Sequence, residues 1–307
     1  MNYPRVSVVV PVRKGGSAKI ALDSLKRIDY PQELIEVFVI EGDNPSLQRN
    51  EGIRKACDEI VLFLDDDSEV DPGLLKETMA VYQDYPDASG VGGPACLKGS
   101  TYFQQATIVI LTSFLGVYRM RARYKPVGSV RYTNEDELIS CNLSVRKGIF
   151  SKGPAFNGAL YPNEENELIY RMQKKGCKFI YSPKCRVYRA TDENLGSFLR
   201  RIFSYGRGRI NQLFVMPSWA SLIKLLPILF VIYIFVLAFI RHPYFVVPLL
   251  WYIAIILFFS VYNSGFRFKI MPIILGLYLA THLTYAVGEF FGIAVNLLSR
   301  MKNAKTS

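Results

Sequence analysis

The stretch VLFLDDDSEVD, residues 61–71, decides the fold prediction, because four apolar residues run directly into three adjacent carboxylates. The apolar run, residues 59–64, is typical of a strand buried in a sheet. Carboxylates packed this closely repel one another, so at least one resists ionisation unless a cation lies among them. The stretch therefore predicts a buried strand that ends at a cation-binding turn.

The segments on either side alternate between strand and helix patterns, which indicates an α/β fold. Runs of β-branched residues predict strands, and apolar residues at helical spacing predict helices. The predicted strands span 5–12, 35–40 and 59–64, and the predicted helices span 17–28, 46–57 and 71–85. We expect Asp71 to cap the last helix, with Pro72 in its first position. Strands joined through helices imply a parallel sheet with right-handed crossovers.

A ligand is expected at the carboxyl ends of these strands, because open α/β sheets bind ligands beyond that edge. The predicted topology brings three strand ends together there: Pro11 to Arg13, Glu41 to Asp43, and Asp65 to Asp67. A carboxylate cluster with no histidine nearby suits a hard cation such as Mg²⁺ or Mn²⁺. A solvated acidic turn is the simpler alternative.

The segment at 101–126 predicts an amphipathic or interfacial helix with a basic tail. A membrane span is disfavoured there, because Gln104 and Gln105 lie near its start and a crossing would separate Asp65 from the later acidic motif. The remaining predicted elements of this half are a strand at 138–147, a helix at 164–176 that ends at Gly176, and short strands at 178–183 and 185–190.

The last third of the chain consists of long apolar runs, near 220–240, 244–262 and 270–298. A membrane-spanning helix needs about 20 mostly apolar residues. We therefore predict an α/β domain at 1–215 and a membrane domain with about three transmembrane helices at 216–307. With three spans the basic tail falls outside the cell, against the positive-inside tendency, so a re-entrant pair in the third run is the alternative.

The N-terminus and the cysteines indicate where the first domain lies. Residues 1–12 carry a short β-branched run without a small-residue cleavage site, unlike a secretory signal peptide. The five cysteines are odd in number and show no C-x-x-C spacing, which favours reduced thiols over disulfides or zinc. We expect the first domain to lie in the cytosol, tethered to the plasma membrane by a multi-pass anchor.

Charge and histidine content narrow the chemistry. The net charge is +11, with basic clusters at 119–125 and 200–209, which suits anionic lipid headgroups or a phosphorylated substrate. Nucleic acid is the competing partner, but we find no RNA-binding or zinc-finger signature. The only histidines, His242 and His282, lie in the apolar third. The first domain therefore has no Ser-His-Asp triad and no histidine-rich zinc site, and its acid–base chemistry falls to carboxylates, lysines or tyrosines.

Four motifs in this order resemble those of family 2 glycosyltransferases. They are VSVVVPVR at 6–13, DDD at 65–67, NEENELIYRMQKKG at 163–176 and RRIFSYGRGR at 200–209. The resemblance covers about residues 5–210 and is nearest to the membrane-anchored enzymes that build exopolysaccharides and glycolipids. It implies a GT-A fold, a Rossmann-like nucleotide-sugar-binding domain, with inversion at the anomeric carbon.

The resemblance also implies roles for individual residues. The implied metal ligands, for Mg²⁺ or Mn²⁺, are Asp65, Asp67 and Glu69. The implied contacts to the nucleotide sugar are Pro11, Arg13, Glu41, Asp43, Arg49, Asp66 and Asp67. The implied catalytic base is Glu165, with Glu164 as the alternative, and the implied contacts to the diphosphate or the acceptor are Arg207 and Arg209.

The sequence departs from the family pattern at two of these places. Glu41 stands where the family has an aspartate that recognises the nucleobase, so Asp43 is its rival for that role. Arg189 stands where many relatives have a histidine, so the metal site is expected to have fewer protein ligands.

The predicted function is a membrane-anchored inverting glycosyltransferase that moves a sugar from a nucleotide-diphosphate sugar to a lipid-linked or growing glycan. One alternative is transfer to a polyprenyl phosphate, which is already ionised and needs no base. Another is an inactive nucleotide-binding scaffold at the membrane. A dinucleotide-dependent dehydrogenase is disfavoured, because PVRKGGSA at 11–18 lacks the G-x-G-x-x-G pattern.

Overall fold

The computed structural model describes residues 3–215, 225–240, 242–265 and 267–306. The chain divides into two compact units. The first contains Met1–Lys98 and Arg119–Ala190, and the second contains Gly99–Tyr118 and Thr191–Ser307. The predicted division into a catalytic domain at 1–215 and a membrane domain at 216–307 stays a prediction. In the structure, residues 99–118 and 191–215 belong to the same compact unit as the C-terminal helices.

A seven-stranded sheet forms the centre of the first unit, in the order β2-β1-β3-β8-β5-β9-β7. Its strands are β1 (Val6–Arg13), β2 (Ile35–Gly42), β3 (Ile60–Leu64), β5 (Ala88–Gly92), β7 (Arg131–Thr133), β8 (Asn142–Arg146) and β9 (Lys178–Tyr181). β1 pairs in parallel with β2 and β3, as predicted. The sheet is nevertheless mixed, because β8 runs antiparallel to both β3 and β5. Alternation along a strand has the same period in either direction, so the sequence pattern carries no sign of this reversal.

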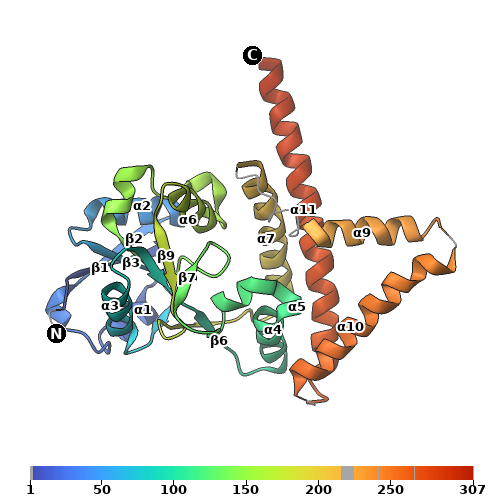
Figure 1. Cartoon of the computed structure of the whole chain (residues 1–307), viewed down its shortest axis with the longest axis horizontal. Coiled ribbons are helices and arrows are strands. Elements are labelled where there is room, and N and C mark those ends of the chain that lie inside the picture. Colours follow the sequence, from blue (N-terminus) through green and yellow to red (C-terminus); the bar gives the residue numbers. More distant parts are fainter. Residues whose placement is uncertain (1–2, 216–224, 241, 266, 307) are drawn as a thin grey trace. The chain divides into compact units, whose positions relative to one another are not determined.

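The helices of this unit cover both faces of the sheet, as Figure 1 shows. They are α1 (Lys19–Leu25), α2 (Pro45–Lys55), α3 (Leu74–Asp84) and α6 (Glu164–Lys174), with short 3₁₀ turns at Gln32–Leu34, Tyr118–Arg123, Lys147–Lys152 and Gly158–Leu160. Val8 and Val10 pack with α1 and α3, whereas Val9 packs with α2 and α6. Successive residues of β1 thus face opposite layers, and both layers are apolar, which explains its unbroken run of valines.

Helix starts show how local chemistry sets the boundaries. α2 begins at Pro45, where the Asn44 side chain accepts the backbone N–H of Ser46 at 3.0 Å. The prediction that Asp71 caps α3 is wrong, because that helix starts three residues later, at Leu74. The Asp71 carboxylate instead accepts the Gly73 N–H and the Tyr188 hydroxyl, at 3.1 Å each, which draws it toward a neighbouring strand.

That neighbouring strand belongs to a second, three-stranded sheet. It comprises β4 (Glu69–Val70), β6 (Ala95–Lys98) and β10 (Val187–Ala190), with β10 in the centre. β4 follows the acidic stretch directly and pairs antiparallel with β10, with Glu69 opposite Tyr188. The small sheet therefore brings β10 beside the acidic turn at the end of β3.

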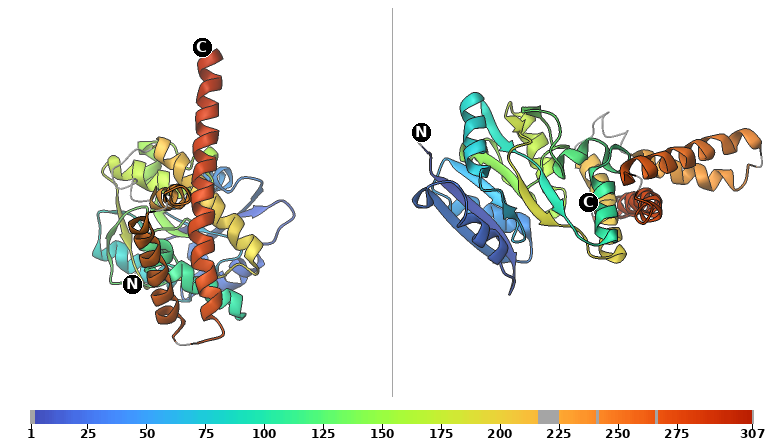
Figure 2. Two further views of the ribbon diagram at one scale, coloured as in Figure 1. Left: turned by 90° about the vertical axis from the view of Figure 1, so that its right-hand side faces the viewer. Right: turned by 90° about the horizontal axis from the view of Figure 1, so that it is seen from below.

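The second unit is helical. Its elements are α4 (Tyr102–Thr112), α5 (Phe114–Val117), α7 (Leu195–Val215), α9 (Leu226–Leu237), a 3₁₀ turn at Pro243–Val246, α10 (Val247–Ser264) and α11 (Met271–Thr306). The helix predicted at 101–126 is interrupted at Ser113, whose extended backbone ends α4 and caps α5. α11 is one continuous helix (Figures 1 and 2). It meets α7 at backbone distance, because a Cβ on Gly206 would lie 2.2 Å from the Tyr285 carbonyl oxygen.

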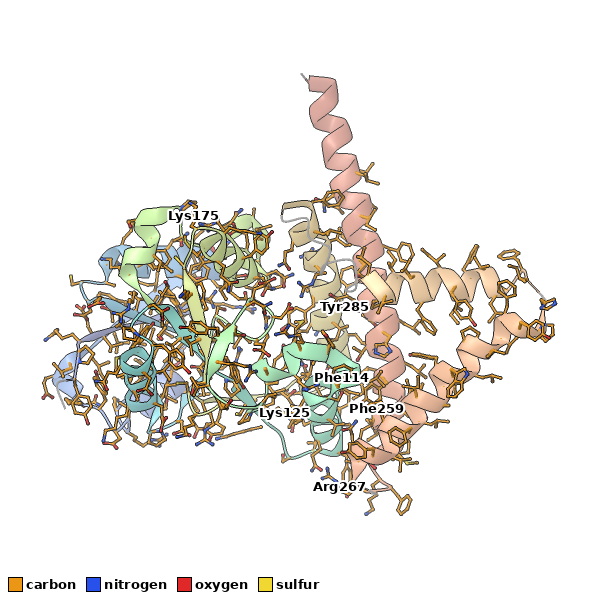
Figure 3. All side chains as sticks on the ribbon, viewed as in Figure 1. Phe114, Lys125, Lys175, Phe259, Arg267 and Tyr285 are labelled. Atoms are coloured by element: carbon orange, nitrogen blue, oxygen red, sulfur yellow. The ribbon has the colours of Figure 1, made fainter. Side chains whose placement is uncertain are left out.

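Two helices are long and apolar enough to cross a membrane: Pro243–Ser264 and Met271–Leu298. Only 11% and 33% of their apolar windows are buried, whereas the core helix of a globular protein is mostly buried. Phe235 on α9 and Trp251 and Phe258 on α10 are exposed aromatic residues. Figure 3 shows side chains that extend outward from both helices. The first predicted span, near 220–240, lies partly outside the described residues, and its described part, α9, has 12 residues.

Candidate active site

The acidic stretch forms a tight turn at the carboxyl end of β3. All five residues of β3 are buried, so the strand holds the start of the turn firmly in the sheet. The Ser68 hydroxyl accepts the Asp65 backbone N–H at 3.2 Å, and the Ser68 N–H donates to the Asp65 carbonyl oxygen at 3.1 Å. These two bonds close the turn and fix where the three carboxylates begin.

Two arginines from distant parts of the chain neutralise this turn. Arg189, on β10, lies 2.9 Å from Asp65 Oδ2 through Nη1 and 2.9 Å from Asp67 Oδ1 through Nε. Its Nη2 also donates to Asp67 Oδ2 at 3.0 Å. Arg49, on α2, donates to Asp65 Oδ1 at 2.7 Å. Both carboxylate oxygens of Asp65 and both of Asp67 are therefore paired with a guanidinium.

The carboxyl groups of the turn differ in their readiness to ionise. Burial raises the pKa of Asp65, but the charges of Arg189 and Arg49 outweigh burial and hold that pKa below its ordinary value. Burial raises the pKa of Asp66, and the adjacent charges of Asp67 and Asp65 raise it further. The turn thus contains one carboxylate, Asp65, that its arginine partners keep ionised, and one carboxyl group, Asp66, that resists ionisation, as the sequence predicts.

The outer two carboxylates can hold one divalent cation between them. The guanidinium of Arg189 occupies the position between them, since it lies within 3.0 Å of oxygens from both Asp65 and Asp67. Glu69 does not reach this point, because its carboxylate pairs with Lys98 on β6. In the part of the chain that the structure describes, no cluster of three or more potential metal ligands is found. Two carboxylates still fit Mg²⁺ or Mn²⁺, which commonly take one or two protein ligands plus substrate phosphates.

A second acidic group lies at the start of α6, where Glu164 and Glu165 are both buried. Glu164 Oε1 accepts from Arg49 Nη1 at 2.8 Å, so Arg49 connects this helix to Asp65. Glu165 Oε1 accepts from Arg123 Nη1 at 3.1 Å. Arg123 is itself held by the backbone carbonyl oxygens of residues 135 and 136 and by the side chain of Asn166.

The two glutamates therefore have different surroundings. Glu164 Oε2 is buried and has no hydrogen-bond partner within the described structure. Burial raises the pKa of Glu164 to about 7, with a further contribution from the charge of Glu165, and Arg49 opposes the change. A carboxylate with one free oxygen and a pKa near neutrality has the properties of a general base.

The residues predicted to contact the nucleotide lie along neighbouring strand ends. In the pairing of β1 with β2, Val12 lies opposite Glu41 and Arg13 lies opposite Gly42. Pro11 is buried within β1, whereas Arg13 and Glu41 are exposed. Asp43, the rival of Glu41, forms an exposed ion pair with Lys14 at 2.7 Å. The structure thus brings these residues to one edge of the sheet.

Arg207 and Arg209 belong to α7 in the second unit. Arg209 is 3% exposed and donates to Gln212 Oε1 at 2.6 Å, whereas Arg207 is partly exposed. Their predicted contact with the diphosphate or the acceptor stays a prediction.

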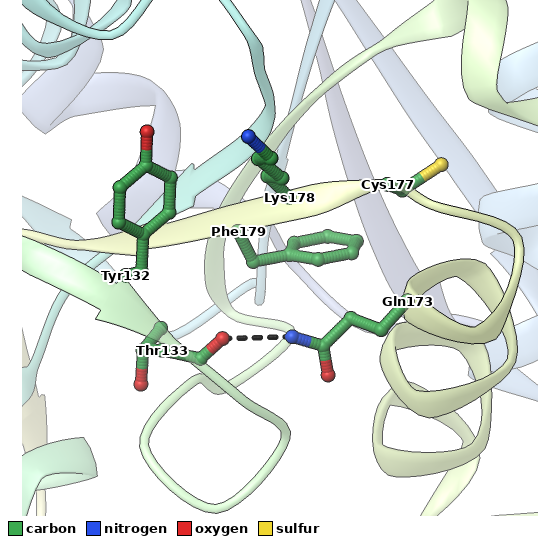
Figure 4. Close-up of a pocket in the computed structure, with 6 residues that line it drawn as sticks. All are labelled: Tyr132, Thr133, Gln173, Cys177, Lys178 and Phe179. Carbon is green, nitrogen blue, oxygen red and sulfur yellow. Dashed lines mark hydrogen bonds between the residues drawn. The ribbon is translucent and has the colours of Figure 1, made fainter.

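A cavity of about 300 Å³ lies at a different place in the first unit (Figure 4). It is lined by Tyr132, Thr133, Gln173, Cys177, Lys178 and Phe179, and Gln173 Nε2 donates to the Thr133 carbonyl oxygen at 2.8 Å. Lys178 begins β9, which runs parallel to β5, and β5 and β3 are both antiparallel to β8. β9 therefore begins at the edge of the sheet opposite the acidic turn, and the cavity is separate from the candidate site.

Sequence reasoning missed three cations of this site. Arg123 belongs to the basic cluster at 119–125, which we expected to meet lipid or phosphate, but it is buried against Glu165. Arg189 was noted only as a residue that cannot bind a metal, and Lys14 was not noted. No spacing in the sequence marks these pairings, because each joins residues that only the tertiary fold brings together.

Comparison with known proteins identifies the kind of domain. Residues 14–153 match the model described as glycosyl transferase family 2. The mannosyltransferase PcManGT from Pyrobaculum calidifontis, solved in complex with GDP-Man and Mn²⁺, aligns with a TM-score of 0.50 at 15% identity, over 100% of this chain and 84% of that chain. The predicted family and its α/β fold of the GT-A type are thereby confirmed.

A further similar structure is S. aureus TarS 1–349 in complex with UDP, which aligns with a TM-score of 0.46 at 12% identity over 93% of this chain and 90% of that chain. No curated protein matches the sequence.

Proposed function

Because residues 14–153 match glycosyl transferase family 2, we propose that this chain moves a sugar from a nucleotide-diphosphate sugar to a hydroxyl group of a lipid-linked or growing glycan. The donor class is supported by the mannosyltransferase of similar fold, which was solved with GDP-Man and Mn²⁺. Exposed Arg13 and Glu41 at adjacent strand ends are suited to contact a nucleotide there.

Glu164 acts as the general base in this proposal. The observation that carries it is the buried, unpartnered Oε2, on a carboxyl group whose pKa is about 7. Arg49 fixes the other oxygen at 2.8 Å, so the free oxygen has one defined direction. Glu164 Oε2 removes the proton from the acceptor hydroxyl while the hydroxyl oxygen attacks the anomeric carbon. The attack comes from the face opposite the diphosphate, which departs, so the anomeric centre is inverted. Glu165, the base implied by the family pattern, accepts from Arg123 through Oε1 at 3.1 Å.

Asp65 and Asp67 would hold Mg²⁺ or Mn²⁺ beside the diphosphate. The bound ion supplies positive charge that stabilises the leaving group. The protein contributes the position of the two carboxylates, which the closed turn after β3 and the Arg49 contact at 2.7 Å maintain.

Paired substitutions test the base. Glu164→Gln keeps the size and removes the basicity, so it should lower transfer by roughly 10²–10⁴-fold, the usual contribution of a general base. Glu165→Gln, the matched control, should retain more activity because Gln can still accept from Arg123. Transfer is measured by product formation with a panel of UDP- and GDP-sugars, and donor binding by calorimetry.

The outcomes separate the alternatives. An inactive Glu165→Gln beside an active Glu164→Gln would assign the base to Glu165. Normal transfer by both variants would favour a polyprenyl phosphate acceptor, which needs no base. Donor binding by the unmodified chain without turnover of any donor would favour a scaffold.

The anchor of the enzyme is proposed to be the pair α10 and α11, with the catalytic unit on the cytosolic side of the cell membrane. Their length and their largely unburied apolar surface support this. Alkaline carbonate should leave the full chain in the membrane fraction and detergent should release it. Release by carbonate alone would mean that the helices bind peripherally, and the case for a lipid-linked acceptor would fall with the anchor.

A further inference from the structure

Arg189 is the side chain that occupies the cation position of the acidic turn. Its three guanidinium nitrogens each contact a carboxylate oxygen, one of Asp65 and two of Asp67, at 2.9–3.0 Å. A divalent cation placed between the same two carboxylates would occupy the position of the Arg189 guanidinium, and like charges at that distance repel. One of the two cations has to leave.

The surroundings of Arg189 allow it to be the one that leaves. Its backbone is fixed in the central strand of the small sheet, and the neighbouring Tyr188 donates its hydroxyl to Asp71. Its side chain, in contrast, is 27% exposed, and that of Asp67 is 41% exposed. The pair of Arg189 and Asp67 is therefore partly exposed, and the guanidinium lies at the end of a flexible stem that extends from a rigid strand.

Arg49, the other arginine that pairs with the turn, is not suited to leave it. Its side chain is 3% exposed and bridges Asp65 to Glu164. Withdrawing it would leave the buried Glu164 without a partner and Asp65 with Arg189 alone, which costs more than opening the partly exposed pair of Arg189 and Asp67. Displacement of Arg189 alone leaves that bridge intact.

We infer that Arg189 is an internal competitor of the divalent cation: it neutralises Asp65 and Asp67 in the donor-free enzyme and gives way when the cation arrives with the donor. The inference rests on the metal-binding part of the proposed function. A cation that arrives alone must expel a guanidinium that has no new partner. A cation that arrives with a diphosphate brings an anion with which the expelled guanidinium can pair.

This exchange couples the two ligands. The enzyme should bind Mn²⁺ weakly by itself and more tightly together with a nucleoside diphosphate, and Arg189 should carry part of that coupling free energy. Arg189 is therefore a residue that sets metal affinity and makes it depend on the donor.

Calorimetry of the full chain in detergent, titrated with Mn²⁺ in the absence and presence of UDP or GDP, tests the exchange. Arg189→Gln, which is neutral and shorter, should bind Mn²⁺ alone about tenfold more tightly, and the gain in affinity from the nucleotide should shrink by about the same factor. Arg189→Lys should lie between Arg189→Gln and the unmodified chain. Lys98→Gln is the matched control, since it removes a nearby positive charge that pairs with Glu69 instead.

Unchanged or weaker Mn²⁺ binding by Arg189→Gln would overturn the inference, and so would an equal gain in Lys98→Gln. If the unmodified chain binds Mn²⁺ while Arg189→Gln behaves identically, the metal site of the proposed function stands and only the competition fails. If no variant binds Mn²⁺ with or without nucleotide, the inference and the metal site both fail. Transfer measured in excess chelator then decides whether the glycosyltransferase activity itself remains.

Discussion

The acidic turn after β3 and the start of α6 use the same chemistry, carboxylates against arginines, in opposite settings. At the turn, the side chains of Asp67 and Arg189 are 41% and 27% exposed. At α6, the side chains of Glu165 and Arg123 are both 5% exposed. An exposed ion pair exchanges its partners with water or a ligand at little cost, whereas a sealed pair does not. The turn is therefore suited to bind and release a charged ligand. The start of α6 is suited to keep its two glutamate side chains in fixed positions.

Arg49 belongs to both regions, since it reaches Asp65 at the turn and Glu164 on α6. Through this bridge the buried start of α6 holds Asp65 in place, whereas Asp67 is paired with Arg189 only. The contrast between the regions can be tested by removing one cation at a time.

The largest effect is expected for Arg49→Met, which leaves Glu164 and Asp65 without their common partner. Breaking a buried ion pair from one side costs about 3–5 kcal/mol of unfolding free energy. Thermal unfolding of the full chain in detergent should show a clearly lowered Tm, with part of the loss recovered at acidic pH as the orphaned Glu164 becomes protonated.

Arg189→Met is the comparison for this experiment. Its loss should be smaller, because Asp67 can be hydrated where it stands. Equal losses for the two variants would mean that exposure does not distinguish the turn from the helix start.

A medium effect is expected on the pH dependence of transfer in Glu165→Gln. The negative charge of Glu165 helps to raise the pKa of Glu164 to about 7, so removing that charge should lower this pKa. The base must be ionised to act, and the acidic limb of kcat/KM should therefore lie near pH 7 in the unmodified enzyme and move to lower pH in the variant.

The pH profile is recorded over the whole range in which the chain stays folded. A limb that stays in place, or moves to higher pH, would show that the titration of Glu164 does not control the rate.

The smallest effect is expected for Lys98→Gln, at the outer side of the same turn. Lys98 pairs with Glu69, and their side chains are 52% and 42% exposed. Exposed pairs of this kind contribute about 0–1 kcal/mol, so Tm should change by no more than a few degrees. A loss as large as that of Arg189→Met would place Glu69 in the same cooperative cluster as Asp65.

Much of the fold followed from local pattern. The valine run of β1 predicted a strand with two apolar layers, and the passage from apolar residues into DDD predicted the end of β3 and its turn. These inferences held because periodicity and composition act on residues that are neighbours in the chain. The reversal of β8 escaped the sequence, since an alternating pattern has no direction.

The candidate site divides in the same way. Sequence alone determined which residues are acidic, that they follow a buried strand or open a helix, and that no histidine of the first domain accompanies them. Only the tertiary structure decided which arginine neutralises which carboxylate, because Arg49, Arg123 and Arg189 reach their partners across 16 to 124 positions of the chain. Burial and pairing set the ionisation of Asp66 and Glu164, and both depend on packing between segments that the sequence keeps far apart.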